Sequence, residues 1–132
     1  MNYLKFENYY FIGIGGVGMS SLAEYMLYLN KKIEGYDREN SFKTKRLTDL
    51  GIRVIFSSNS KKINPIFKNS KNTIVVITPA IDKNNLILKY FKINNFTIIK
   101  RSDLLAEIVN PSFCIAIAGT HGTVSYTHLR AH

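Results

Sequence analysis

The fold is decided by one stretch of the sequence, residues 9–20, which reads YYFIGIGGVGMS. It opens with a short, apolar, β-prone run, and from Met19 to Leu29 the apolar residues recur on one helical face. Between these two segments, Gly13, Gly15 and Gly18 have the spacing G-x-G-x-x-G. The stretch therefore predicts a strand, a tight turn and a helix, which is the context in which this spacing indicates a phosphate-binding loop.

Each glycine of this loop has a physical role in such a site. The first allows a tight turn, the second lets the backbone approach a phosphate, and the third lets helix and strand pack closely. The N-terminus of the helix adds unpaired N–H groups and a partial positive charge, and Ser20 adds a hydroxyl donor. The loop predicts a diphosphate site, but a nicotinamide dinucleotide and a UDP-sugar offer that same group.

An acidic residue follows the next predicted strand, in Gly35-Tyr36-Asp37. Asp37 lies about 20 residues beyond the glycine loop, where a dinucleotide-binding fold places an acid on a ribose. The spacing agrees equally well with an aspartate that caps a helix or holds a loop, so both interpretations stay open.

The rest of the chain alternates apolar runs with amphipathic stretches. Further strands are predicted at residues 32–36, 53–56, 73–77, 96–99 and 113–118, and helices from Ser41 to Leu50, from Asn84 or Asn85 to about Asn94, and from a Ser102 cap to Val109. Residues 57–72 are predicted to form a loop with about one helical turn. Strands that are apolar throughout are typical of parallel sheets covered by helices. We therefore expect a single-domain α/β fold, a Rossmann-like parallel sheet with helices on both faces.

Composition narrows the function classes. The 132 residues fit one domain, and 18 basic against 9 acidic residues give a net charge of +9. The lysines are scattered rather than clustered, so we expect no nucleic-acid partner. No apolar run is long enough to cross a bilayer and no signal-peptide pattern is present, so we expect no membrane partner and a cytoplasmic location. Cys114 is the only cysteine, which excludes an internal disulfide.

A second glycine turn follows the last predicted strand. Its residues Gly119, Thr120, His121 and Gly122 resemble the opening of an ATP-binding P-loop, which continues with a lysine and then a serine or threonine. Thr123 and Val124 stand at those positions, so the P-loop is incomplete. The following residues show neither helical nor strand periodicity, and their histidines lack acidic or thiol neighbours, so no metal site is expected.

Several motifs together resemble the Mur ligases, in particular those that join L-alanine to UDP-N-acetylmuramate. They are, in chain order, residues 11–20 (FIGIGGVGMS), 35–37 (GYD), 78–81 (TPAI), 100–105 (KRSDLL) and 118–122 (AGTHG). They occur in the order of the family and cover most of the chain, which makes the resemblance far more specific than one glycine motif.

The resemblance implies that the first domain binds the UDP part of UDP-N-acetylmuramate. The implied contacts are Gly13, Gly15, Gly16, Val17, Gly18, Met19 and Ser20 at the diphosphate, Asp37 near the ribose or uracil, and Thr78, Pro79, Ala80 and Ile81 in the same crevice. Arg101 could contact a phosphate or be an ordinary surface charge, and we favour the surface charge.

In the family, the complete enzyme uses ATP and Mg²⁺ to form an amide bond in peptidoglycan synthesis. On this resemblance, residues 1–110 form the UDP-sugar domain, 111–122 the first strand and incomplete P-loop of an ATP-binding domain, and 123–132 a disordered tail foreign to the family. We expect this chain alone to be inactive as a ligase, with no catalytic residue of its own, and to bind neither ATP nor Mg²⁺ well.

Alternative functions stay open at this point. The glycine loop with Asp37 also fits an NAD(P)-binding domain of an oxidoreductase, or a non-enzymatic nucleotide-sensing module. Within the family, ligases that attach a whole peptide share these motifs, so the ligated group is undecided. The sequence does not indicate an oligomeric state.

Overall fold

A computed structural model describes residues 2–110 of the chain. Its elements are β1 (Asn8–Ile12), α1 (Met19–Tyr28), β2 (Lys32–Tyr36), α2 (Phe42–Asp49), β3 (Arg53–Ile55), the 3₁₀ turns η1 (Ser60–Lys62) and η2 (Pro65–Lys68), β4 (Thr73–Ile77), α3 (Leu86–Ile93), β5 (Thr97–Lys100) and α4 (Arg101–Ile108). The strands and helices predicted for this part of the chain are confirmed. The strand predicted at 113–118, the incomplete P-loop and the tail lie outside the described residues.

The strands form one parallel, five-stranded sheet in the order β3-β2-β1-β4-β5. β1 lies at its centre, where Tyr9 is in register with Ile33 of β2 on one side and Ile74 of β4 on the other. The chain therefore changes its direction of travel across the sheet between β1 and β4. In open α/β sheets, ligands bind beyond the carboxyl ends of the strands at this switch point.

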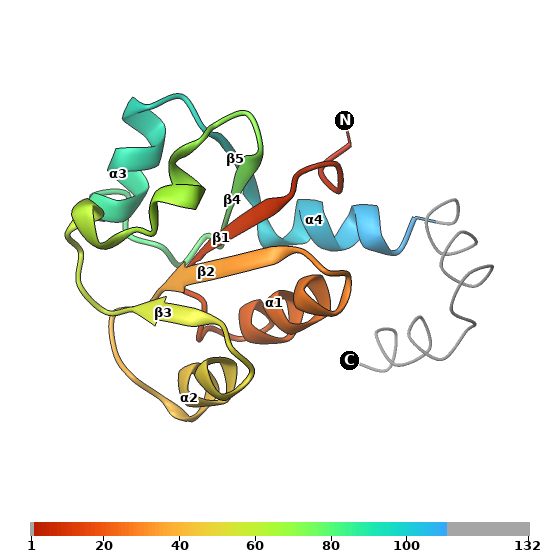
Figure 1. The fold of residues 1–132 in the computed structure, drawn as a ribbon, viewed down its shortest axis with the longest axis horizontal. Coiled ribbons are helices and arrows are strands. Elements are labelled where there is room, and N and C mark those ends of the chain that lie inside the picture. Colours follow the sequence, from red (N-terminus) through yellow and green to blue (C-terminus); the bar gives the residue numbers. More distant parts are fainter. Residues whose placement is uncertain (1, 111–132) are drawn as a thin grey trace.

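Helices cover both faces of the sheet, as predicted (Figure 1). On one face, α1, α2 and α4 pack over Tyr9 and Phe11. On the other, α3 and the two 3₁₀ turns pack over Tyr10 and Ile12. All four of these β1 side chains are fully buried, which explains why the strand is apolar at consecutive positions.

Helix starts follow from local capping, with one correction. Ser41 caps α2 through reciprocal bonds with Thr44, and the Asn85 side chain accepts from the Leu88 N–H at 3.0 Å, as the sequence predicts. The Ser102 cap is wrong, because α4 already begins at Arg101. The Asp103 carboxylate reaches back to accept the Lys100 N–H at 3.2 Å, which fixes the start before Ser102.

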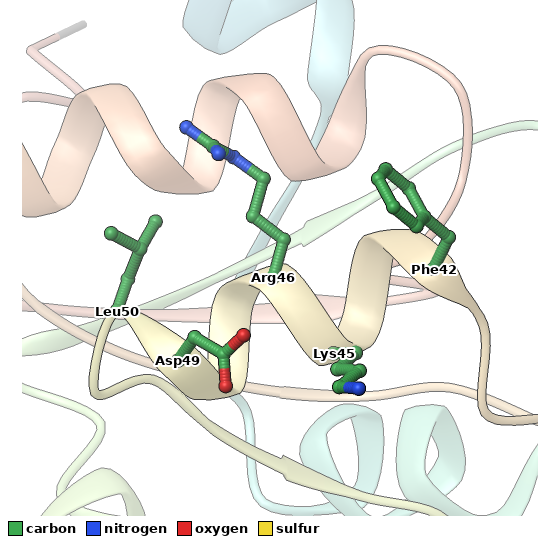
Figure 2. A pocket seen from close by; sticks show the side chains of 5 residues that line it. All are labelled: Phe42, Lys45, Arg46, Asp49 and Leu50. Atoms are coloured by element: carbon green, nitrogen blue, oxygen red, sulfur yellow. The ribbon is translucent and has the colours of Figure 1, made fainter.

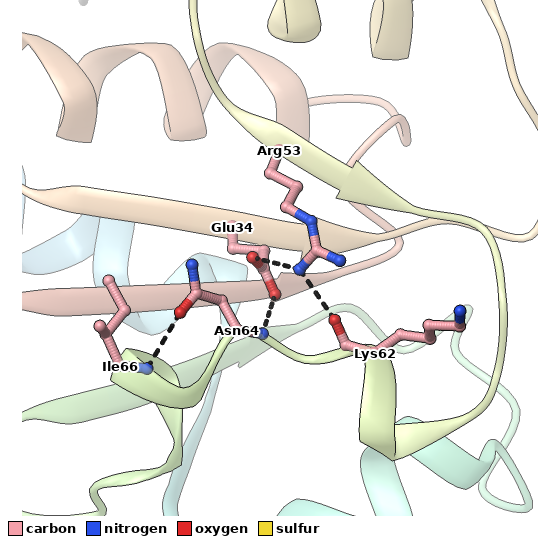
Figure 3. Close-up of polar contacts among 5 residues, drawn as sticks. All are labelled: Glu34, Arg53, Lys62, Asn64 and Ile66. Carbon is pink, nitrogen blue, oxygen red and sulfur yellow. Dashed lines mark hydrogen bonds and ion pairs between the residues drawn. The ribbon is translucent and has the colours of Figure 1, made fainter.

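Residues 57–72 contain two 3₁₀ turns, more helical structure than predicted. They are tied to the sheet through Glu34 of β2, whose side chain is 1% exposed (Figure 3). Its carboxylate accepts from Arg53 Nη1 at 3.0 Å and from the Asn64 N–H at 3.1 Å. Arg53 also donates to the Lys62 carbonyl at 2.8 Å, so one buried carboxylate connects two strands to both turns.

In the part of the chain that the structure describes, no helix has both the length and the apolarity needed to cross a bilayer.

Candidate functional site

The glycine loop leaves β1 at the carboxyl edge of the sheet and turns tightly into α1. Gly13 and Gly18 have φ values of +83° and +78°, which side-chain-bearing residues rarely adopt. The N–H groups of Gly13 and Ile14 donate to the Tyr36 carbonyl at 2.7 and 3.0 Å, and Gly16 donates back to the Gly13 carbonyl at 2.9 Å. These bonds hold the turn against β2.

The loop leaves backbone donors available at the start of α1. Within residues 2–110, the N–H groups of Val17 and Gly18 have no hydrogen-bond acceptor. The Met19 N–H donates to the Gly16 carbonyl at 3.1 Å, and its side chain is fully buried, as is most of Ser20. Two adjacent free donors at the positive end of a helix are suited to an anion.

Asp37 contacts the glycine loop directly. Its Oδ2 accepts the Gly15 N–H at 2.7 Å, and its Oδ1 accepts the Glu39 N–H at 3.3 Å. A Cβ atom on Gly15 would lie 2.8 Å from both Asp37 Oδ2 and Thr44 Cγ2. Glycine is therefore needed here for contact with Asp37 and α2. The spacing left two interpretations of Asp37 open. The structure shows that Asp37 holds the loop, and a contact with a ribose stays a prediction.

The turn after β4 lies beside the glycine loop, as expected for the switch point. A Cβ atom on Gly13 would lie 2.8 Å from Ile81 Cδ1, and the Ile81 N–H donates to the Thr78 carbonyl at 3.1 Å. Thr78 and Ile81 are half-buried, and Pro79 and Ala80 are exposed. Residues 78–81 thus form one side of the candidate site.

Arg101 also belongs to this edge, contrary to the expectation of an ordinary surface charge. It is half-buried, and a Cβ atom on Gly18 would lie 2.9 Å from its Nη1. A signal was available in the sequence, because Arg101 directly follows a strand of a parallel sheet. Residues at that position lie on the same edge as the loop after β1.

A shallow hollow on α2 is separate from this loop (Figure 2). It is lined only by side chains of α2 and its C-cap: Phe42, Lys45, Arg46, Asp49 and Leu50. Arg46 is held there by Glu24 of α1 at 2.9 Å. A hollow between the side chains of one helix lacks the converging elements of a ligand site.

The remaining candidate groups are metal ligands and the predicted ATP-binding residues. Within residues 2–110, no group of three or more His, Cys, Asp or Glu side chains is arranged to hold a metal ion. The residues predicted to contact ATP, Gly119, Thr120, His121 and Gly122, lie outside the described residues.

A comparison with protein families matches residues 8–112 to the Mur ligase family, catalytic domain. Among curated relatives, the UDP-N-acetylmuramate–L-alanine ligases of Flavobacterium psychrophilum and Flavobacterium johnsoniae are 39% and 42% identical over the whole of this chain. The chain spans 29% of the length of each of these relatives.

Solved structures share the fold. A UDP-N-acetylmuramate-alanine ligase from Thermotoga maritima aligns with a TM-score of 0.68 at 22% identity, covering 77% of this chain and 22% of that protein. A UDP-N-acetylmuramate:L-alanyl-gamma-D-glutamyl-meso-diaminopimelate ligase from Neisseria meningitides aligns with a TM-score of 0.67 at 22% identity, covering 79% and 31%. None of these matches supports the oxidoreductase alternative.

Proposed function

Because this chain belongs to the Mur ligase family, we propose that it binds the UDP part of UDP-N-acetylmuramate at the glycine loop. The observation that carries the proposal is the pair of free N–H groups on Val17 and Gly18 at the start of α1. They lie at the sheet's switch point, beside the turn of residues 78–81. A diphosphate there gains hydrogen bonds from the amides and a favourable interaction with the helix dipole.

The other proposed contacts lie at the same carboxyl edge of the sheet. Asp37 holds the loop through Gly15 and lies at the end of β2, where a ribose or uracil would be reached. The turn of residues 78–81 lines the other side of the crevice. Met19 and Ser20 would support the loop, because both are buried and their N–H groups donate to the Gly16 carbonyl.

For the whole protein we propose an ATP-dependent ligase that joins L-alanine to UDP-N-acetylmuramate in peptidoglycan synthesis, in the cytoplasm. The names of the curated relatives support L-alanine over a peptide, because several of them are L-alanine ligases at 36–42% identity. ATP with Mg²⁺ would supply the phosphoryl group that activates the substrate carboxylate.

A binding experiment tests the proposal. Isotope-labelled chain is titrated with UDP-N-acetylmuramate while its amide resonances are followed, with NADH as the comparison ligand. We expect the resonances of Val17 and Gly18 to shift most with the UDP-sugar. Shifts there with NADH alone, or no response at millimolar UDP-N-acetylmuramate, would contradict it.

A further inference from the structure

We propose that Arg101 is a further binding residue of this site, and that its guanidinium binds the diphosphate together with the Val17 and Gly18 amides. The inference deepens the proposed function and rests on it, because that function supplies the anion. Its ligand class is a diphosphate ester, not the uracil or the sugar.

The geometry places the guanidinium at the free amides. Arg101 is the first residue of α4, and its side chain extends to the start of α1. The position of a Gly18 Cβ atom would be 2.9 Å from Nη1, 3.2 Å from Cζ and 3.3 Å from Cδ of Arg101. The side chain therefore contacts Gly18, and a Cβ atom at this position would force the guanidinium to shift.

The charge of Arg101 has no counter-charge among residues 2–110. Arg38, Arg46 and Arg53 each have a glutamate oxygen nearby, at 3.6, 2.9 and 3.0 Å. Within the described residues, the Arg101 side chain has neither an ion pair nor a hydrogen bond, although the residue is half-buried. The neighbouring Asp103 carboxylate is bonded to the Lys100 N–H instead.

A half-buried cation without a partner is stabilised when an anion arrives. The planar guanidinium suits phosphate oxygens because it can donate two parallel hydrogen bonds. The two amides at the start of α1 and the guanidinium at the start of α4 would contact a diphosphate from two sides. A purely structural role, in which the side chain only covers Gly18, predicts loss of stability instead of loss of phosphate affinity.

Calorimetric titration of the full 132-residue chain separates these roles. Arg101→Met keeps much of the side-chain length without the charge, and Arg101→Lys keeps the charge without the fork. Lys92→Met is the matched control, because Lys92 is an exposed cation on α3, across the sheet. Each variant is titrated with UDP-N-acetylmuramate and with uridine, and its melting temperature is measured.

We expect Arg101→Met to bind UDP-N-acetylmuramate about 10- to 100-fold more weakly, with an intermediate loss in Arg101→Lys. Uridine affinity, melting temperature and the Lys92→Met control should stay near the wild-type values. Equal affinity of wild type and Arg101→Met would overturn the inference alone, as would a loss explained by a lower melting temperature. Absence of binding by the wild type would overturn the proposed function and this inference with it.

Discussion

At Gly18, the backbone conformation disfavours a residue with a side chain, and a Cβ atom would displace Arg101. Its φ of +78° costs an ordinary residue about 1–2 kcal/mol, and its missing side chain makes room for Arg101. Gly51 also has a positive φ, +95°, but a Cβ atom there would meet nothing within 4 Å. A substitution at Gly51 therefore tests the conformational cost alone, whereas a substitution at Gly18 tests that cost together with the loss of the Arg101 contact.

We predict that Gly18→Ala lowers the free energy of unfolding and weakens UDP-N-acetylmuramate binding, because the new methyl group displaces Arg101. Gly51→Ala should cost only the conformational part, about 1 kcal/mol, and leave binding unchanged. Urea unfolding and calorimetric titration measure both effects. Equal ligand affinities for the two variants would argue against a role for the Arg101–Gly18 contact.

Two buried tyrosines make stability depend on alkaline pH. Burial, followed by the Glu107 carboxylate, raises the pKa of Tyr9 well above its usual value near 10. Burial, followed by the Glu34 carboxylate, does the same to the pKa of Tyr10. Both phenols thus keep their protons in the folded chain at a pH where the unfolded chain loses them, so their contribution to stability is present below pH 10 and lost above it.

We predict that the free energy of unfolding declines as pH rises above about 10, and that Tyr10→Phe makes the decline shallower. Urea unfolding at a series of pH values measures the slope. Tyr28→Phe is the control, because the Tyr28 side chain is 54% exposed, and it should keep the wild-type slope. The same slope in Tyr10→Phe would show that Tyr10 does not contribute.

At the scale of elements, the Glu34 cluster joins β2, β3 and the two 3₁₀ turns. Arg53→Met removes the charged partner of the buried carboxylate and leaves the bond from the Asn64 N–H. We predict a loss of about 1–2 kcal/mol, less than for a fully buried pair because Arg53 is 49% exposed. Adding Glu34→Leu should recover part of the loss.

Urea unfolding of the two single variants and the double variant gives the coupling between the partners. Arg46→Met, which breaks the more exposed pair with Glu24, is the control and should change stability little. Additive losses for Glu34 and Arg53 would show that the two side chains act independently.

Elements with a clear local cause were predictable from sequence. The apolar run of β4 and the Ser41 cap reappear as predicted. The start of α4 was missed because the bond between Asp103 and the Lys100 N–H competes with the Ser102 cap. Glu34 was missed, and Arg101 was expected to be a surface charge, for a different reason. The residues that they contact lie far along the chain, so only the folded sheet brings them together.

At the scale of the whole molecule, three helices begin at the edge that carries the glycine loop. Gly18 is the N-cap of α1, Thr44 of α2 lies against Gly15, and Arg101 of α4 lies against Gly18. These helix starts and the net charge of +9 for the whole chain agree with the proposed anionic ligand. The apolar strands predicted a parallel sheet, and the observed strand order accounts for the convergence of these loops.

The sequence of the second glycine turn predicts that this chain does not turn over ATP. Thr123 and Val124 stand where a P-loop has its lysine and its magnesium-binding hydroxyl. We predict no alanine-dependent phosphate release from the 132-residue chain in the presence of UDP-N-acetylmuramate, ATP and Mg²⁺. The ligase of Flavobacterium johnsoniae, assayed in parallel, is the positive control. Turnover above background by this chain would contradict the prediction.

A crystal structure of the chain with bound UDP-N-acetylmuramate tests the central claim most directly. The account predicts diphosphate oxygens about 3 Å from the N–H nitrogens of Val17 and Gly18, with Asp37 still bonded to Gly15. A complex in which these amides face solvent while the diphosphate is bound elsewhere would contradict it.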